Sequence, residues 1–111
     1  MRPANRQQAV QHMEHLLGRK LVGRRKTRVK EHTNRAKRMA AAIWTRFQVG
    51  PYQYQLKHLE WYLETQTHHL TANTAYRHWL TTKNVVAALG KETDWIGRLQ
   101  GAWTRPKSSE I

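Results

Sequence analysis

The 111-residue sequence contains no cysteine and only two serines, Ser108 and Ser109, close to the end of the chain. Without cysteine the chain forms neither disulfides nor thiolate zinc sites, and it has no thiol nucleophile. A serine hydrolase would carry its nucleophile on an unanchored end, whereas such enzymes hold the nucleophile beside a base. Glycine-rich loops that cradle phosphates are also missing. These absences predict that the chain by itself is not an enzyme.

Long hydrophobic runs are missing as well. No apolar segment approaches the ~18 residues of a membrane span. The first twenty residues carry His, Glu, Gln and Arg where a signal peptide would need an apolar stretch. We therefore expect a soluble, unexported protein of the cytoplasm, associated with the nucleoid if it is bacterial. Its five Trp, four Tyr and one Phe argue against complete disorder.

Positive charge, in contrast, is in large excess. The chain has 20 Lys and Arg against 7 Asp and Glu, a formal net charge of +13. Residues 1–50 hold 13 of these cations and 2 acids, whereas residues 51–111 hold 7 cations and 5 acids. Like charges at this density repel one another unless a polyanion neutralises them. Clustered Lys and Arg are typical of proteins that bind nucleic acid, where each neutralised phosphate releases counterions.

The excess of positive charge has two other interpretations. A solvated tail that only keeps the protein soluble is the plainest one. A membrane surface is poorly matched, since an interfacial helix needs a strong apolar face and segment 19–30 offers only Leu21, Val22 and Val29. We therefore expect the basic residues to contact nucleic acid. The candidate phosphate-binding cations are Arg19, Lys20, Arg24, Arg25, Lys26, Arg28, Lys30, Arg35, Lys37 and Arg38.

The N-terminal region, residues 1–30, is predicted to be a short helix followed by a basic arm. Apolar residues spaced three and four apart predict an amphipathic helix over residues 7–17 that ends at Gly18. This helix could pack on the body of the protein or stand apart as an appendage. The segment 18–30 is predicted to be flexible, or to become ordered by a ligand.

Residues 31–103 are predicted to form one helical DNA-binding domain, and residues 104–111 a polar tail. The first helix of this domain is expected over 31–48, with Thr33 as its N-cap, because apolar residues repeat every three to four positions. A second helix is expected over 51–67.

A third helix is expected to start at Thr71 or Asn73 and to run to Leu89, where Gly90 stops it. A short helix capped by Thr93 or Asp94 follows, and Trp103 is expected to dock back on the core. No segment alternates cleanly enough to predict a strand. The fold class is therefore all-α, a small four- to five-helix bundle with a basic N-terminal arm.

The third helix carries many short hydrogen-bond donors, of a kind that contacts phosphates or base edges. A solvated helix face has the same composition. The donors are Thr74, Arg77, His78, Thr81, Thr82, Lys83 and Asn84. Thr74, Arg77 and Lys83 complete the set of nucleic-acid-binding candidates. The tryptophans lie beside aliphatic positions, which favours the core over base stacking, since stacking needs rings exposed within a basic surface.

Seven histidines do not complete a metal site. His12 and His15 lie three apart on a predicted helix, and His68 and His69 lie in a linker. Neither pair has a cysteine or a His-Glu-x-x-His motif to complete the ~4 ligands of a closed zinc site. We expect neither a metal nor another cofactor.

Three successive segments resemble those of a known protein family. They are His32–Phe47, with Thr33 near its start and an aromatic residue at its end; Gln55–Leu63, which ends in Tyr-Leu; and Leu70–Gly90, which begins Leu-Thr-x-x-Thr. In this order they resemble the core-binding, SAM-like domain of tyrosine recombinases of the phage-integrase type. The resemblance covers about residues 31–92. It implies a helical domain that clamps DNA, with Lys and Arg on phosphates and the third helix near a groove.

The catalytic residues of that family have no counterpart here. Its Arg, His-x-x-Arg and nucleophilic Tyr are not reproduced by Tyr76-Arg77-His78. The resemblance therefore implies a stand-alone or truncated DNA-binding module, an accessory or competitor of a recombinase in a mobile element. The expected partners are DNA, with RNA as the alternative, and a recombinase or other nucleoprotein complex. An RNA-binding or ribosome-associated protein, and a protein-interaction module such as a phage-encoded inhibitor or assembly factor, remain open alternatives.

Overall fold

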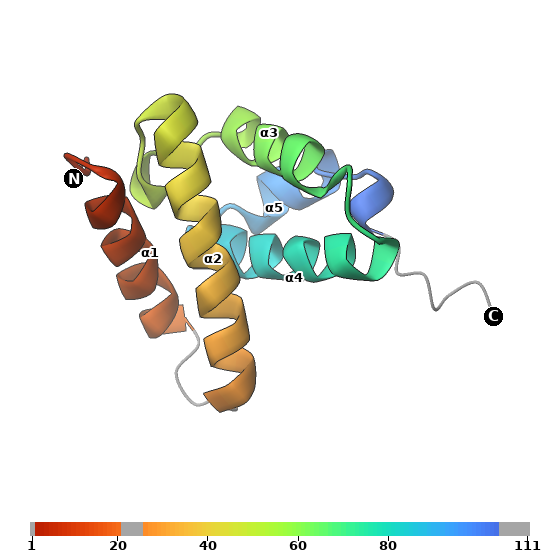
Figure 1. The fold of residues 1–111 in the computed structure, drawn as a ribbon, viewed down its shortest axis with the longest axis horizontal. Helices are drawn as coiled ribbons and strands as arrows, with labels where there is room; N and C mark the ends of the chain where they lie inside the picture. Colours follow the sequence, from red (N-terminus) through yellow and green to blue (C-terminus); the bar gives the residue numbers. More distant parts are fainter. Residues whose placement is uncertain (1, 21–25, 105–111) are drawn as a thin grey trace.

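The described part of the chain folds into five α-helices around one core (Figure 1). The structure is a computed structural model that describes the backbone of residues 2–20 and 26–104, and the side chains of residues 2–18 and 30–104. No strand occurs among these residues, so the predicted all-α fold is confirmed. The helices are α1 (Arg6–Lys20), α2 (Lys26–Phe47), α3 (Leu56–Thr67), α4 (Ala72–Ala88) and α5 (Glu92–Trp95), and short 3-10 turns span Pro51–Gln53, Ile96–Arg98 and Ala102–Thr104.

Helix α1 belongs to the body of the protein. It lies alongside α2 (Figure 1), and its residues Met13 and Leu17 are fully buried together with Met39 and Ile43 of α2. Lys37 of α2 also lies 3.8 Å from the Glu14 carboxylate of α1. Full burial of each large aliphatic side chain stabilises the fold by about 1.5–3 kcal/mol. The N-terminal helix is therefore packed against the core and is not an appendage.

The described residues of the basic arm predicted over 18–30, namely 18–20 and 26–30, are helical. Helix α1 continues past Gly18 to Lys20, and α2 already begins at Lys26, so Thr33 lies inside a helix and does not cap one. A glycine inside a helix costs only about 0.5–1 kcal/mol, which is less than the burial of the neighbouring Leu17 provides. Lys and Arg are also good helix formers. Residues 21–25 lie outside the described residues.

The link after α2 is held by a close contact with the N-terminal segment. Helix α2 ends at Phe47, and Gln48 takes a left-handed conformation with φ 55°. Gly50 then packs against Pro3 so tightly that an added Cβ would lie 2.7 Å from the Pro3 Cδ. Helix α3 starts at Leu56 and not near residue 51, after the 3-10 turn and the two extended residues Tyr54 and Gln55.

Helix α4 has the two ends predicted from its sequence. Thr71 is the N-cap, and its hydroxyl accepts a hydrogen bond from the backbone N–H of Thr74. At the other end Gly90 has φ 73°, and the Lys91 N–H donates to the Val86 carbonyl. These features are those of a Schellman cap.

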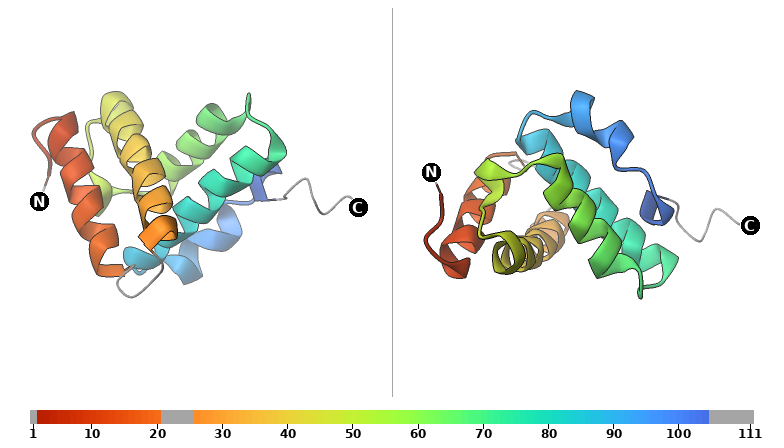
Figure 2. Two further views of the ribbon diagram at one scale, coloured as in Figure 1. Left: turned by 60° about the horizontal axis from the view of Figure 1, so that its bottom comes forward. Right: turned by 90° about the horizontal axis from the view of Figure 1, so that it is seen from above.

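The C-terminal segment covers the side of α4 that lies away from α3 (Figure 2). Helix α5 begins at Glu92, with Lys91 at the cap position, so neither Thr93 nor Asp94 caps it as predicted. Trp103 does dock on the core, as expected, and its indole N–H donates to the Leu99 carbonyl at 2.7 Å.

Candidate nucleic-acid interface

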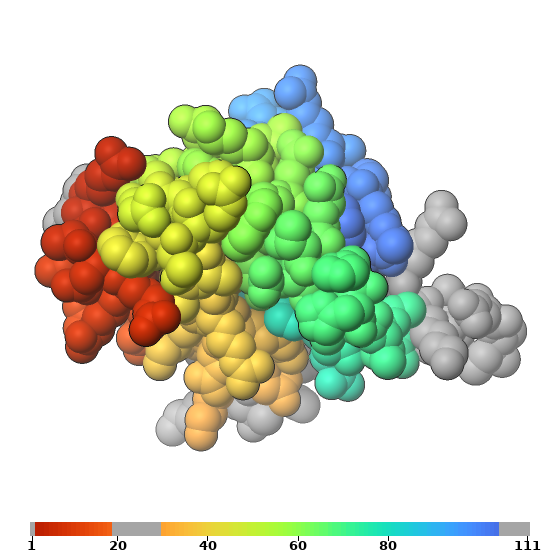
Figure 3. All heavy atoms as spheres, turned by 45° about the horizontal axis from the view of Figure 1, so that its top comes forward, coloured from red at the N-terminus to blue at the C-terminus, as the bar shows by residue number. Residues whose placement is uncertain are grey.

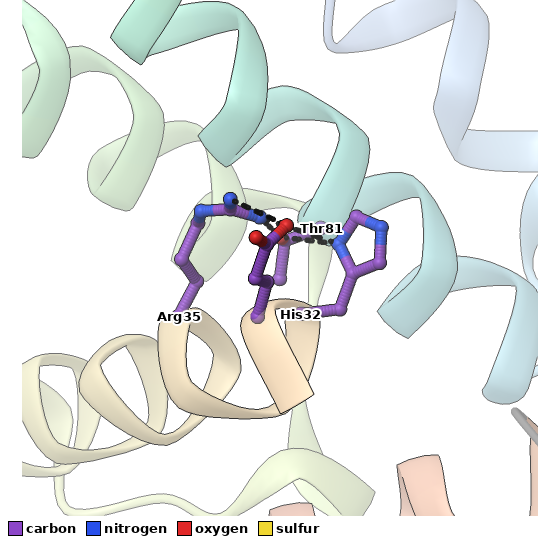
Figure 4. Close-up of polar contacts among 4 residues, drawn as sticks. His32, Arg35 and Thr81 are labelled. Carbon is purple, nitrogen blue, oxygen red and sulfur yellow. Dashed lines mark hydrogen bonds and ion pairs between the residues drawn. The ribbon is translucent and has the colours of Figure 1, made fainter. Parts of the chain in front are cut away.

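A polar contact joins α2 to α4 at Thr81, which is 1 % exposed (Figure 4). The Arg35 guanidinium donates to the Thr81 hydroxyl at 3.1 Å, and His32 Nδ1 lies 2.9 Å from the same oxygen. A hydroxyl has one proton to donate, and Arg35 can only donate. The network is therefore satisfied when Thr81 donates to His32 and accepts from Arg35, which fixes the direction of the Arg35 side chain.

A second polar pair joins α3 to α4 close to the first. The Tyr62 hydroxyl and His78 Nδ1 lie 3.0 Å apart. Burial lowers the pKa of His78, and the charges of Arg35 and Arg38 lower it further. Burial raises the pKa of Tyr62 to about 12. Near neutral pH both groups are therefore uncharged, and Tyr62 donates its hydroxyl proton to the imidazole.

Three guanidinium groups gather around these two contacts, and we call Arg35, Arg38 and Arg77 the arginine cluster. Desolvation lowers the pKa of Arg35; Glu31 opposes this shift, while Arg77 and Arg38 lower the pKa further. The Glu31 carboxylate lies 3.9 Å from Arg35 and is 58 % exposed. Arg38 and Arg77 are exposed to solvent, whereas Arg35 is only 19 % exposed. The cluster thus has one fixed guanidinium and two accessible ones.

The other predicted cations differ in whether their side chains are free, paired or outside the described residues. Lys30 and Lys83 are exposed. Lys37 is engaged with Glu14 and links α2 to α1. The predicted cations whose side chains lie outside the described residues are Arg19, Lys20, Arg24, Arg25, Lys26 and Arg28.

The donor-rich face predicted for α4 is mostly not free to contact a ligand. Thr81 and Thr82 are buried, and the Thr82 hydroxyl donates to the His78 carbonyl. A threonine that bonds to the carbonyl four residues earlier can enter the core, because its hydroxyl is already satisfied. Asn84 donates in the same way to Leu80.

The remaining candidates on α4 differ in what their side chains do. The Thr74 hydroxyl accepts from Thr71 and helps to hold the start of the helix. Arg77 and Lys83 are exposed. Only these two of the predicted α4 donors are therefore charged and open to solvent.

A groove that was not predicted lies further along α2 than the cluster, where α2 runs between α1 and α3 on the face shown in Figure 3. It has a volume of about 410 Å³. Ala41, Ala42 and Thr45 of α2 contribute to its surface, together with Arg6 of α1 and Trp61 of α3. The run of small residues in α2 was the available sequence signal, but its meaning depends on which helices flank it.

Residues 2–20 and 26–104 contain no group of three or more His, Asp or Glu side chains placed to hold a metal ion. Within the same part of the chain, no helix combines the length and the apolar character that crossing a membrane requires.

Comparison with known proteins adds no relative to this picture. The sequence matches no protein-family model, no curated protein and no solved structure.

Proposed function

We propose that this protein binds the backbone of duplex DNA through the arginine cluster. The observation that carries the proposal is that Arg38 and Arg77 lie close enough to Arg35, where α2 packs on α4, for their charges to lower its pKa. Guanidinium groups pair with phosphate through two parallel hydrogen bonds, which makes Arg well suited to hold a nucleic-acid backbone. Arg38 and Arg77 are exposed and free for such pairing, while Thr81 keeps Arg35 in place.

The overall charge supports the same proposal. Residues 1–50 carry a net charge of +11, and the cluster draws two of its three arginines from this half. Lys30 and Lys83 add further exposed positive charge on α2 and α4. A field of this sign attracts a polyanion and speeds its association.

The biological setting that we propose comes from the sequence resemblance. A stand-alone module similar to the core-binding domain of tyrosine recombinases would act as an accessory or competitor at recombination sites of a mobile element. In that setting α4 would lie near a DNA groove and α2 would contact phosphates. A pull-down of a recombinase of the same element, with and without added DNA, tests the proposed biological setting separately from DNA binding.

Salt-dependent binding of two matched variants tests the DNA proposal. The double variant R38A/R77A removes two exposed cations of the cluster, and K91A/R98A removes two exposed cations near α5. We expect R38A/R77A to lower the slope of log affinity against log salt by about 2, because each lost phosphate contact lowers it by about 1. The control K91A/R98A should keep most of the slope.

Equal losses in both variants would show that only net charge matters and would overturn the cluster as the site. Competition between a duplex DNA and a structured RNA of equal length then decides the ligand. A clear preference for the RNA would replace DNA by RNA, and failure to bind either would exclude the proposed function.

A further inference from the structure

We propose that the groove between α1, α2 and α3 holds one unstacked nucleobase, so that the protein binds DNA best where a base is unpaired. This inference rests on the proposed function and deepens it, because it assigns a second site with a different chemistry. The arginine cluster offers charge to phosphates, whereas the groove combines an aromatic wall with small side chains.

The groove is shallow and open to solvent, and its lining is mostly apolar, so a flat ring can lie against it. Ala41 and Ala42 leave space above α2, and Trp61 provides an indole at the side. Trp61 packs edge-on with Phe47, with ring centroids 5.4 Å apart and planes at 86°. Phe47 itself packs against His58. The indole is therefore held in place before a ligand arrives, and a fixed aromatic face is what base stacking requires.

The rim of the groove favours a ligand with negative charge. Arg6 of α1 and Arg46 of α2 line it, with Gln66 of α3, and the described lining includes no carboxylate. The Arg46 guanidinium lies 5.0 Å from the centroid of the Phe47 ring, which positions it by a cation–π contact. A nucleotide offers both of the required parts, a flat base for the indole and a phosphate for the guanidinium groups.

Helix α2 connects this groove to the arginine cluster. Arg38, Ala42 and Arg46 are spaced four residues apart, so they follow one face of the helix. From Arg38 to Arg46 the helix rises about 12 Å. Along the axis of a DNA duplex that distance spans three or four phosphates of one strand, because each adds about 3.4 Å of rise. A strand held by Arg38 can therefore reach the groove within a few nucleotides.

Binding to two DNA duplexes tests the inference. One duplex is fully paired, and the other has the same sequence with a single bulged 2-aminopurine. We expect the wild-type protein to bind the bulged duplex at least tenfold more tightly. The 2-aminopurine fluorescence should fall on binding, because the base stacks on an indole.

Two variants address the groove itself. A41L fills the groove from an α-helical position where Leu is well tolerated, and W61L removes the aromatic wall. Both should lose the preference for the bulge while keeping the affinity and salt slope for the paired duplex. A102L, on an exposed alanine in the C-terminal turn, is the matched control for A41L and should behave as wild type. Circular dichroism and the midpoint of thermal unfolding identify any variant that fails to fold.

The outcomes separate this inference from the proposed function. Equal affinity of the wild-type protein for both duplexes, or a preference that survives in folded A41L, overturns the groove as a base site and leaves the DNA proposal standing. Loss of all DNA binding in the wild-type protein overturns both. Displacement of the bulged base by an acidic peptide at micromolar concentration would assign the groove to a protein partner and would also overturn the inference.

Discussion

The guanidinium of Arg35 and the hydroxyl of Thr81 meet across the interface between α2 and α4, 3.1 Å apart and 46 positions apart in the chain. Their contact does two things at once. It fastens the long α2 helix to α4, and it holds one arginine of a cluster whose other members face solvent. A single threonine thus contributes to packing and to the charge pattern of the surface.

Replacing Thr81 with valine should destabilise the protein. Valine keeps the shape but removes the hydroxyl, which leaves Arg35 without this acceptor and His32 Nδ1 without this partner. Leaving a buried polar group unsatisfied costs about 1–3 kcal/mol. Urea unfolding of T81V measures this loss, and T81S, which retains the hydroxyl, should recover much of it. A T81V protein as stable as wild type would show that the hydroxyl is not needed.

Stability should fall when the pH drops below about neutrality. The folded pKa of His78 is below its usual value of 6.5, mainly through burial and then through Arg35 and Arg38. The unfolded chain therefore takes up a proton near pH 6.5 while the folded chain resists it, so acid favours unfolding. The contribution is complete above pH 6.5 and is lost as the pH falls toward the folded pKa.

Thermal unfolding of wild type and H78N between pH 7.5 and 5 checks this prediction. Asparagine offers Tyr62 an acceptor but does not titrate, so H78N should show a weaker pH dependence. Part of the dependence should remain, because burial also lowers the pKa of His58. Identical pH profiles for the two proteins would contradict the role of His78.

Removing the carboxylate beside the cluster should strengthen DNA binding. Glu31 lies 3.9 Å from Arg35 and offsets part of the positive charge. Because Glu31 is exposed, we expect E31Q to raise the affinity only about two- to fivefold at low salt, and less at high salt. E92Q changes the charge equally on α5, away from the cluster, and should have a smaller effect. Fluorescence anisotropy with a labelled duplex measures both.

Replacing Gly50 with alanine should disturb the N-terminal segment. An added methyl group would lie 2.7 Å from Pro3 Cδ, which is closer than real contacts allow. Overpacking of this kind costs about 1–3 kcal/mol. The double variant P3A/G50A removes the clash and should regain part of the lost stability in urea unfolding. If the second substitution instead adds to the loss, the clash is not the cause.

The sequence predicted those features of the fold that depend on neighbouring residues. Thr71 and Gly90 were correctly placed at the ends of α4, because an N-cap hydroxyl and a left-handed glycine act within one helical turn. The end of the first helix was misplaced at Gly18. The helix continues past Gly18 because its side chains are buried against α2, and local helix propensity carries no information about that contact.

The candidate site was only partly predictable for the same reason. Arg38 and Arg77 were identified from charge alone, and both are exposed. Thr81 and Thr82 were expected to face a ligand, but they are buried. Threonine occurs both in the core and at the surface of helices. Which of the two applies depends on contacts with residues that are distant in the sequence. The groove required three helices to be placed together, so the small residues of α2 gave no prediction of it.

The position of His78 among the arginines has a consequence for how ligand and proton affect each other. A phosphate bound at the cluster would screen the charges of Arg35 and Arg38, which help to keep the imidazole neutral. The occupied cluster would therefore bind a proton at His78 more readily, and by reciprocity a protonated His78 would favour the occupied cluster. Acid weakens the fold of the free protein, but it would then raise the affinity of the protein for a polyanion. Proton uptake would therefore accompany formation of the complex.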